Sequence, residues 1–222
     1  MESDFEFEID VNEVESFEVV DYFYEYHANV RIGSSLCAQY IRNRLKRSGI
    51  FHRKLGLKRM RSSTLLPDLA VVSEVSPVLI AIGTELEKVN PNLYVRIGRQ
   101  TGCGSFSDQT VAVTMTHVSR EIIRHGEITW SKIISIYAVA GGIAVDCVRQ
   151  GKPEYLLVIQ KALASVLEQD LAIWIQTNGG WSALVSRYRS STKTPEWNTK
   201  KLALFVAVIT PIVFILAIVI RL

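Results

Sequence analysis

The side chains that proteins most often use for catalysis and metal binding are scattered along this sequence of 222 residues. The cysteines form no CxxC pair and suit neither a disulfide framework nor a zinc site, which fits a reducing compartment. The histidines show no metal-ligand spacing, and no Ser/His/Asp or Cys/His arrangement emerges from the order of the residues. These residues are Cys37, Cys103, Cys147, His27, His52, His117 and His125. We therefore predict no enzyme, no metal site, no cofactor and no nucleic-acid partner.

Recognition between helices is the chemistry that the sequence favours instead. One apolar stripe at helical spacing comprises Val75, Leu79, Ile82, Leu86 and Val89. Gly83 removes side-chain bulk where this face must approach another helix. Helix-in-groove recognition uses such a stripe. The alternative is an ordinary amphipathic helix docked on its own core, and both hold if the face packs inward until it is released.

Charge is unevenly distributed although the net charge is only +3. The first 27 residues carry ten Asp and Glu and no Lys or Arg, whereas Arg42 to Arg61 holds nine Lys and Arg. An acidic arm and a basic patch of this kind can attract anionic lipid or an acidic partner. They can equally be solvated faces without a partner.

Helices must position these residues, and one predicted helix has a special character. Thr129 can cap a helix that runs to about Gln150, and Ile133 to Val145 within it contains no charge. A helix that is apolar on every face must be surrounded by other helices. Strand signals are weak throughout. The predicted fold class is all-α, a helical globule around this central apolar helix.

The surrounding helices are predicted from apolar spacing and from Gly and Pro signals. One ends at Gly49, and a second begins with Ser76 as N-cap and Pro77 as first helical residue and ends at Asn90-Pro91. A third contains Val111, Met115, Val118 and Ile122 and closes at Gly126. After a turn at 151–153, a fourth runs from about Tyr155 to Ile175, and a last short helix begins at Trp181 after the break at 178–180.

The C-terminal segment predicts the compartment. Leu202 to Ile220 has no charge over nineteen residues, and at about 1.5 Å per residue it would span roughly 28 Å, the thickness of a bilayer core. We expect a tail anchor with the bulk of the chain in the cytosol. The predicted organisation is an acidic arm at 1–27, a helical domain at 28–189, a linker at 190–201 and a transmembrane tail anchor at 202–220.

Four stretches, in this order and with this tail, resemble the homology motifs of the Bcl-2 apoptosis-regulator family. Gly126–Lys132 with Tyr137–Gly142 resembles the first motif (BH1), and Trp174–Trp181 the second (BH2). Val75–Leu86 resembles the third, or death, motif (BH3), and Leu36–Gly49 the fourth (BH4). The runs 135–140 and 145–150 are particularly similar to the Bok branch of the family.

The resemblance implies a role for each motif residue. The BH3 helix would present Val75, Leu79, Ile82, Gly83, Thr84, Glu85 and Leu86. The groove that receives such a helix would be built from Val111, Met115, Val118, Gly126, Trp130, Lys132, Gly141, Gly142, Trp174, Asn178, Gly179, Gly180 and Trp181. The three tryptophans could be core anchors or groove walls. The BH4-like residues would be Leu36, Tyr40, Ile41 and Leu45.

Two positions depart from the family pattern. Thr84 stands where the family usually has Asp, with Glu85 next, and Lys132 stands where the family usually has Arg. Lys is a point charge without the bidentate fork of Arg, so an ionic contact at Lys132 would be less geometrically selective. We expect Lys132→Glu to weaken binding of a BH3 helix while leaving stability little changed, because Glu suits a helix N-terminus.

The function that the resemblance implies is regulation of apoptosis at the outer mitochondrial or endoplasmic reticulum membrane. Its partners would be BH3-containing Bcl-2 family proteins, in homo- and heterodimers, and the lipid bilayer. A Bok-like effector would expose Val75–Leu86, insert the apolar hairpin Thr129–Ile175 and permeabilise the outer mitochondrial membrane. An anti-apoptotic protein that sequesters BH3 helices would share the same groove, hairpin and anchor. A tail-anchored tethering protein would need a long heptad run before the anchor, and 182–199 has none.

Deletion of residues 202–222 tests the anchor. The truncated chain should move to the soluble cytosolic fraction, because the remaining helices are expected to expose too little apolar surface to insert unaided. Carbonate extraction of membranes from cells that express both forms measures this. Retention of the truncated chain in the carbonate-resistant pellet would show that another segment anchors the protein.

Overall fold

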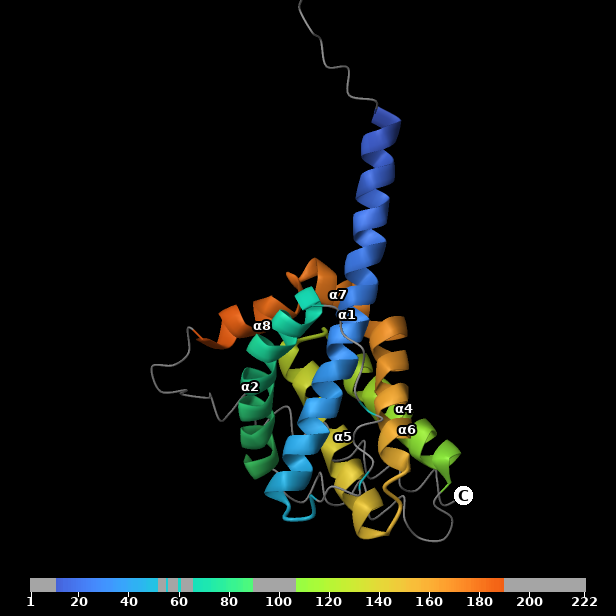
Figure 1. The fold of residues 1–222 in the computed structure, drawn as a ribbon, viewed down its shortest axis with the longest axis vertical. Helices are drawn as coiled ribbons and strands as arrows, with labels where there is room; N and C mark the ends of the chain where they lie inside the picture. The colour runs from blue at the N-terminus through green and yellow to red at the C-terminus, as the bar shows by residue number, and fades with distance from the viewer. Residues whose placement is uncertain (1–10, 52–54, 56–59, 61–65, 90–106, 190–222) are drawn as a thin grey trace, which may run out of the picture.

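Helices form all the regular structure in the described part of the chain, which comprises residues 11–51, 55, 60, 66–89 and 107–189 of a computed structural model (Figure 1). The elements are α1 (Val11–Arg47), α2 (Leu66–Val89), α4 (Asp108–Arg124), α5 (Trp130–Arg149), α6 (Tyr155–Val166), the π-helical turn η3 (Leu167–Leu171), α7 (Ala172–Thr177) and α8 (Gly180–Arg189). The predicted all-α class is confirmed. The predicted linker and tail anchor lie outside the described residues.

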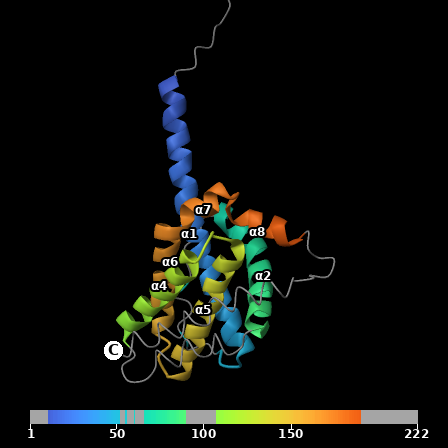
Figure 2. The ribbon, with the colours of Figure 1, turned by 180° about the vertical axis from the view of Figure 1, so that it is seen from behind.

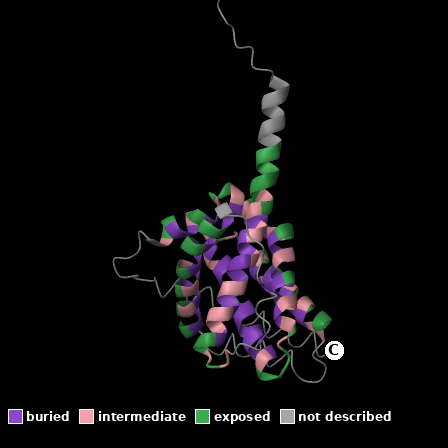
Figure 3. Ribbon diagram, viewed as in Figure 1, coloured by how far each residue is buried: buried purple, intermediate pink, exposed green. Residues whose placement is uncertain are grey.

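The central helix is α5, as the sequence predicts. Thr129 accepts a hydrogen bond from the Lys132 amide as N-cap, and Gln150 is the C-cap. Every residue from Lys132 to Cys147 is buried, and Figure 3 shows the buried ribbon concentrated around this helix. Helices α1, α2, α4 and α6 all contact it. Because no face of α5 can remain in water, each of its neighbours turns an apolar face towards it.

Helix α1 is the longest element. It packs on α2, α5, α6 and α7, and its N-terminal turns project beyond the globule (Figures 1 and 2). No Gly or Pro interrupts residues 11–32. The predicted boundary between an arm and a domain at residues 27 and 28 therefore falls within one continuous helix. Helix α1 ends as expected, with Gly49 at a φ of 69°.

Helix α2 begins at Leu66, eleven residues before the predicted first helical residue, Pro77. The prediction of Ser76 as N-cap and Pro77 as first helical residue is wrong, because Pro77 lies inside the helix. Val72 is buried in line with Val75 and Leu79, so extending the helix buries further apolar surface. Pro77 removes one helical hydrogen bond to residue 73. Ser73 is exposed to water, which limits the cost of that loss.

The remaining helix ends follow the predicted Gly signals with one exception. Positive φ angles occur at Gly126, Gly151, Gly179 and Gly180. The single helix predicted from Tyr155 to Ile175 is instead α6, the π turn η3 and α7. A π turn adds one residue to a helical turn. It allows Leu167 and Leu171 both to be buried at the junction.

At Gly33, α1 lies close to η3 and α8. A Cβ atom at this position would lie 2.5 Å from Leu167 Cδ1 and 2.9 Å from Trp181 Cζ2. The Tyr137 hydroxyl of α5 donates to the Gly33 carbonyl at 3.0 Å. The glycine thus lets α1, α5, η3 and α8 meet at one point.

Gly33→Val should therefore destabilise the fold by overpacking. Such substitutions typically cost about 1–3 kcal/mol, and each kcal/mol lowers Tm by about 2–4 °C in a protein of this size. Thermal unfolding followed by circular dichroism measures the shift. The matched control is Asp21→Val, which places the same side chain at an exposed position of α1. Equal Tm values for the two variants would show that the crossing at Gly33 is not tight.

Candidate functional site

The apolar face of the BH3-like helix α2 points into the protein. Val75, Leu79, Ile82 and Leu86 are buried, and α2 contacts α1, α5 and α8. Val89, the last residue of the predicted stripe, is half exposed. In this structure the stripe therefore serves as core packing, which is one of the two roles that its pattern allows.

Tyr40 of α1 brings three of the resemblance motifs together. A Cβ atom at Gly83 of α2 would lie 2.6 Å from Tyr40 Cε2, and one at Gly141 of α5 would lie 2.9 Å from Tyr40 Cε1. The ring is therefore held between two glycines on two different helices. The other BH4-like residues, Leu36, Ile41 and Leu45, are fully buried on the same helix.

A polar cluster fastens the C-terminal end of α2 to α1. Glu87 is buried, accepts a hydrogen bond from the Tyr40 hydroxyl at 2.8 Å, and lies 3.2 Å from Arg44 Nε and 2.9 Å from Arg47 Nη1. We call Tyr40, Arg44, Arg47 and Glu87 the α1–α2 latch. A carboxylate is buried at tolerable cost only when it is paired in this way. At the other end of α2, buried Asp68 pairs with Arg31 of α1 at 2.9 Å.

Glu87 was not predicted as a functional residue from the sequence. Two features of the sequence could have pointed to it. Glu87 directly follows Leu86 of the apolar stripe, and Arg44 and Arg47 lie one helical turn apart on another helix. Neither signal identifies a partner, because charged residues on a helix usually lie on a solvated face. Only the packing of α1 against α2 joins them.

Thr84 and Glu85 are both engaged within α2. The Thr84 hydroxyl donates to the Ile80 carbonyl at 2.7 Å, and exposed Glu85 pairs with Lys88 at 2.7 Å. The Thr84 side chain is only half-buried, so it lies at the margin of the stripe. Of the two, Glu85 carries the carboxylate that a partner could reach.

Lys132 has a structural role that its sequence pattern did not predict. It is only 6% exposed, and its ammonium donates to the carbonyls of Ile123 at 3.3 Å and Gly126 at 3.1 Å, and also to that of His125. These carbonyls lie at and just beyond the C-terminus of α4, where a cation is favoured. The expectation that Lys132→Glu leaves stability little changed is therefore wrong, since the side chain is folded back beneath carbonyl oxygens.

The other predicted groove residues belong mainly to the core. Val111, Met115 and Val118 on α4 are buried, as are Gly141 and Gly142 on α5. Gly126, Asn178 and Gly179 are exposed, and Gly180 is partly so. The Asn178 amide donates to the Trp174 carbonyl at 2.7 Å, which closes α7. Residues 90–106, between α2 and α4, lie outside the described residues, so the groove itself stays a prediction.

The three motif tryptophans lie together. Trp130 is 5.2 Å from Trp174 and 5.8 Å from Trp181 between ring centroids. Trp181 is buried and donates from its indole to the Asn29 carbonyl at 2.9 Å, while Trp174 is partly exposed. Trp130 and Trp181 are therefore core anchors, and the cluster joins α1, α5, α7 and α8.

Reactive side chains do not gather in the described part of the chain. No three His, Cys, Asp or Glu side chains there are placed to hold a metal ion. Burial raises the pKa of the Cys37 thiol, so this cysteine stays protonated and unreactive at neutral pH. The site thus consists of packed helices, of which α1 and α2 are also joined by ion pairs.

Comparison with known proteins decides the family. A family model described as "Apoptosis regulator proteins, Bcl-2 family" matches residues 79–181. The zebrafish Bcl-2-related ovarian killer protein homolog B is 34% identical over 168 residues, which cover 74% of this chain and 76% of that protein. The chain belongs to the Bcl-2 family. The Bcl-2-related ovarian killer protein of chicken is 36% identical over 148 residues, which cover 67% of this chain and 66% of that protein.

Solved structures of Bcl-2 family proteins agree with the fold. The solution structure of human BOK has a TM-score of 0.61 at 31% identity and covers 73% of this chain and 99% of that one. The crystal structure of Trichoplax adhaerens trBcl-2L2 bound to trBak BH3 has a TM-score of 0.57 at 20% identity and covers 72% and 99%. This Bcl-2 family chain is thus an apoptosis regulator of the Bok type, as its motifs predict.

Lys132→Glu should lower stability strongly, because it sets a carboxylate against the three carbonyls that now hold the ammonium. Breaking a buried charged cluster typically costs about 3–5 kcal/mol. Lys132→Met keeps the apolar stem but leaves the carbonyls without their donor, at about 1–3 kcal/mol. The control is Lys161→Glu on the exposed side of α6. Thermal unfolding should rank the Tm values as control, Met, then Glu, and a Glu variant as stable as the control would contradict the buried placement.

Proposed function

We propose that this chain is a Bok-type pro-apoptotic effector that binds BH3 helices in a hydrophobic groove and permeabilises the outer mitochondrial membrane. Residues 202–220 would anchor it, with the helical domain on the cytosolic side of the outer mitochondrial or endoplasmic reticulum membrane. Its partners would be BH3-containing Bcl-2 family proteins and the bilayer. The groove would lie among α2, α4 and α5.

The observation that carries the proposal is the way in which α2 is held. Its motif face is packed on the core, yet both its ends are fastened to α1 by ion pairs, at Asp68 and at Glu87. Ion pairs can be broken by charge changes that leave the apolar face unaltered. Such a helix can therefore be docked in one state and free to bind a groove in another.

The composition of two helices supports the membrane step. Asp68–Val89 and Trp130–Arg149 are long and apolar enough to cross a bilayer, by length and composition. Of the most apolar 18-residue stretch of Trp130–Arg149, 89% is buried, as in the core helix of a soluble protein. For Asp68–Val89 the buried fraction is 39%. Release of α2 would uncover α5, and a bilayer would then offer α5 an apolar environment that water does not.

A related fold supports the groove. The solved structure of trBcl-2L2, which has the same fold at 20% identity, is of a complex with trBak BH3. We expect the equivalent surface of this chain to accept a BH3 helix, with Trp174, the partly exposed member of the tryptophan cluster, near its end. An anti-apoptotic protein would use the same surface. A membrane-release assay is therefore needed to tell a pro-apoptotic from an anti-apoptotic function.

Breaking the α1–α2 latch tests the effector role. The double variant Arg44→Ala, Arg47→Ala leaves Glu87 buried without its cations, which should loosen α2 by about 3–5 kcal/mol. Full-length protein in liposomes should then release a trapped dye several-fold faster than wild type at equal protein. Arg120→Ala is the matched control, because it breaks an ion pair with Asp170 that does not involve α2.

The outcomes separate the candidate functions. Faster release from the latch variant alone, further increased by a BH3 peptide, supports the effector. A chain that never releases dye but blocks release by an activated effector is an anti-apoptotic protein instead. Equal release from the latch variant and from Arg120→Ala would remove the proposed link between α2 and the membrane step.

A further inference from the structure

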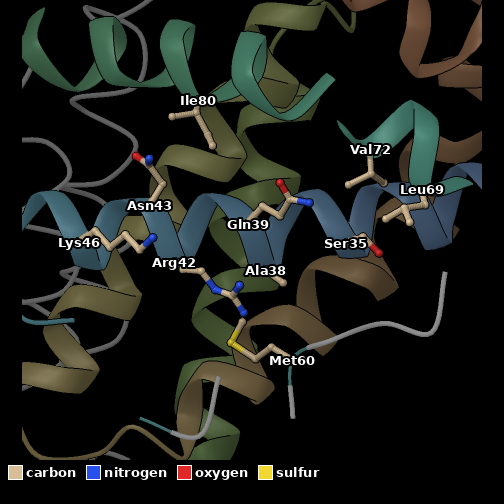
Figure 4. Close-up of a pocket in the computed structure, with 10 residues that line it drawn as sticks. All are labelled: Ser35, Ala38, Gln39, Arg42, Asn43, Lys46, Met60, Leu69, Val72 and Ile80. Atoms are coloured by element: carbon tan, nitrogen blue, oxygen red, sulfur yellow. The ribbon is translucent and has the colours of Figure 1, made fainter. Parts of the chain in front are cut away.

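A second groove runs along α1, apart from the predicted BH3 groove (Figure 4). Its volume is about 620 Å³. Helix α1 lines it with polar side chains that include Arg42 and Lys46, and α2 lines it with Leu69, Val72 and Ile80. Figure 4 shows Arg42 extending away from α2 towards Met60, while Leu69, Val72 and Ile80 lie on the side of α2. Among the described residues, no acidic side chain lines this groove.

Two polar atoms in the groove lack a partner in the described structure. Ser35 is 8% exposed, and its hydroxyl makes no hydrogen bond. The Nε atom of Arg42 is buried and also makes none. Buried donors without acceptors are rare in native proteins and are costly. Both atoms can donate, and the groove carries positive charge, so its chemistry fits an occupant rich in carboxylates.

The two sides of the groove define the shape of that occupant. Polar residues of α1 run from Ser35 to Lys46, and the apolar wall of α2 runs alongside from Leu69 to Ile80. An occupant that matches needs carboxylates along one side and apolar groups along the other. A fatty acid or lipid carries its charge at one end only, so it matches this arrangement less well.

The chain contains such a segment at its N-terminus. Asp4, Glu6, Glu8 and Asp10 alternate strictly with Phe5, Phe7 and Ile9. In an extended chain, successive side chains point to opposite sides. In an extended conformation, residues 4–10 would span about 20 Å from Asp4 to Asp10 at roughly 3.3 Å per residue. The helical stretch from Ser35 to Lys46 spans about 16 Å at roughly 1.5 Å per residue, so it has room for about five of these seven residues at a time.

We propose that the α1–α2 groove binds residues 4–10 of a second copy of this chain. The carboxylates would face Arg42, Lys46 and the Ser35 hydroxyl, and the two phenylalanines and Ile9 would face the wall formed by α2.

The reach of the chain requires the second copy. Helix α1 begins at Val11, so Arg42 lies about 46 Å further along the helix at roughly 1.5 Å per residue. Ten extended residues reach at most about 36 Å. The segment therefore cannot reach Arg42 of its own chain. The N-terminal turns of α1 project beyond the globule of their own chain (Figure 1).

Titration of a fluorescent peptide with residues 1–11 into the full-length protein in non-ionic detergent tests the contact. Anisotropy should show saturable binding. Lys46→Glu in the protein should weaken it at least tenfold, and a peptide with Glu8→Lys should recover affinity for that variant. Lys161→Glu, an equal charge reversal at an exposed position of α6, should change nothing. A peptide of the same composition with the alternation scrambled should bind at least tenfold more weakly.

Association between copies is measured separately, on two full-length chains with different tags. The copies should co-purify, and excess peptide should reduce the yield several-fold. The proposal is wrong if the native peptide does not bind or binds no better than the scrambled one. It is also wrong if the peptide binds without reducing co-purification. A third contrary result would be that Lys46→Glu weakens binding to phosphatidylserine vesicles but not binding to the peptide. These readouts need neither a BH3 peptide nor membrane permeabilisation, so they are independent of the proposed function.

Discussion

Burial of α5 is the constraint on which the other helices depend. A helix with no charge from Ile133 to Val145 cannot stay in water, so α1, α2, α4 and α6 must each cover part of it. Loss of any one cover exposes apolar surface that only another apolar medium can accept. The property that organises the soluble fold is therefore also the one that would suit α5 to lipid.

The approach of α2 to that core is set by one aromatic ring. Tyr40 fills the space that Gly83 and Gly141 leave, and its hydroxyl reaches Glu87. Apolar packing and ion pairing are thus combined on neighbouring atoms. Packing alone would hold α2 in any ionic environment, whereas the buried carboxylate makes the docking depend on its arginines. This combination distinguishes α2 from α4, whose inward face is mainly apolar.

Patterns that act locally could be predicted from the sequence. The Thr129 cap, the ends of helices at Gly49, Gly126 and Gly151, and the central place of α5 follow from short-range rules and were expected. Contacts between distant segments could not be predicted in this way. The contacts of Glu87 and of Lys132 depend on which helices pack together, and a single sequence does not show this.

The early start of α2 and the π turn were missed for a related reason. A proline is an ordinary sign of a helix start, and only burial of Val72 outweighs it. The π turn at 167–171 arises because two leucines must both reach the core at a helix junction. In both places tertiary packing overrides the local preference of the chain.

Pro77 weakens the helical hydrogen bonding in the middle of α2. It lies between the two fastenings, with Asp68 on one side and Glu87 on the other, and it interrupts the hydrogen-bond ladder there. The two parts of α2 can therefore detach one after the other. While one end stays fastened, the free end keeps a high effective concentration near its docking site. Detachment of one end of α2 is then readily reversible until the ion pairs at the other end also break. Full release of α2 is therefore a two-step event.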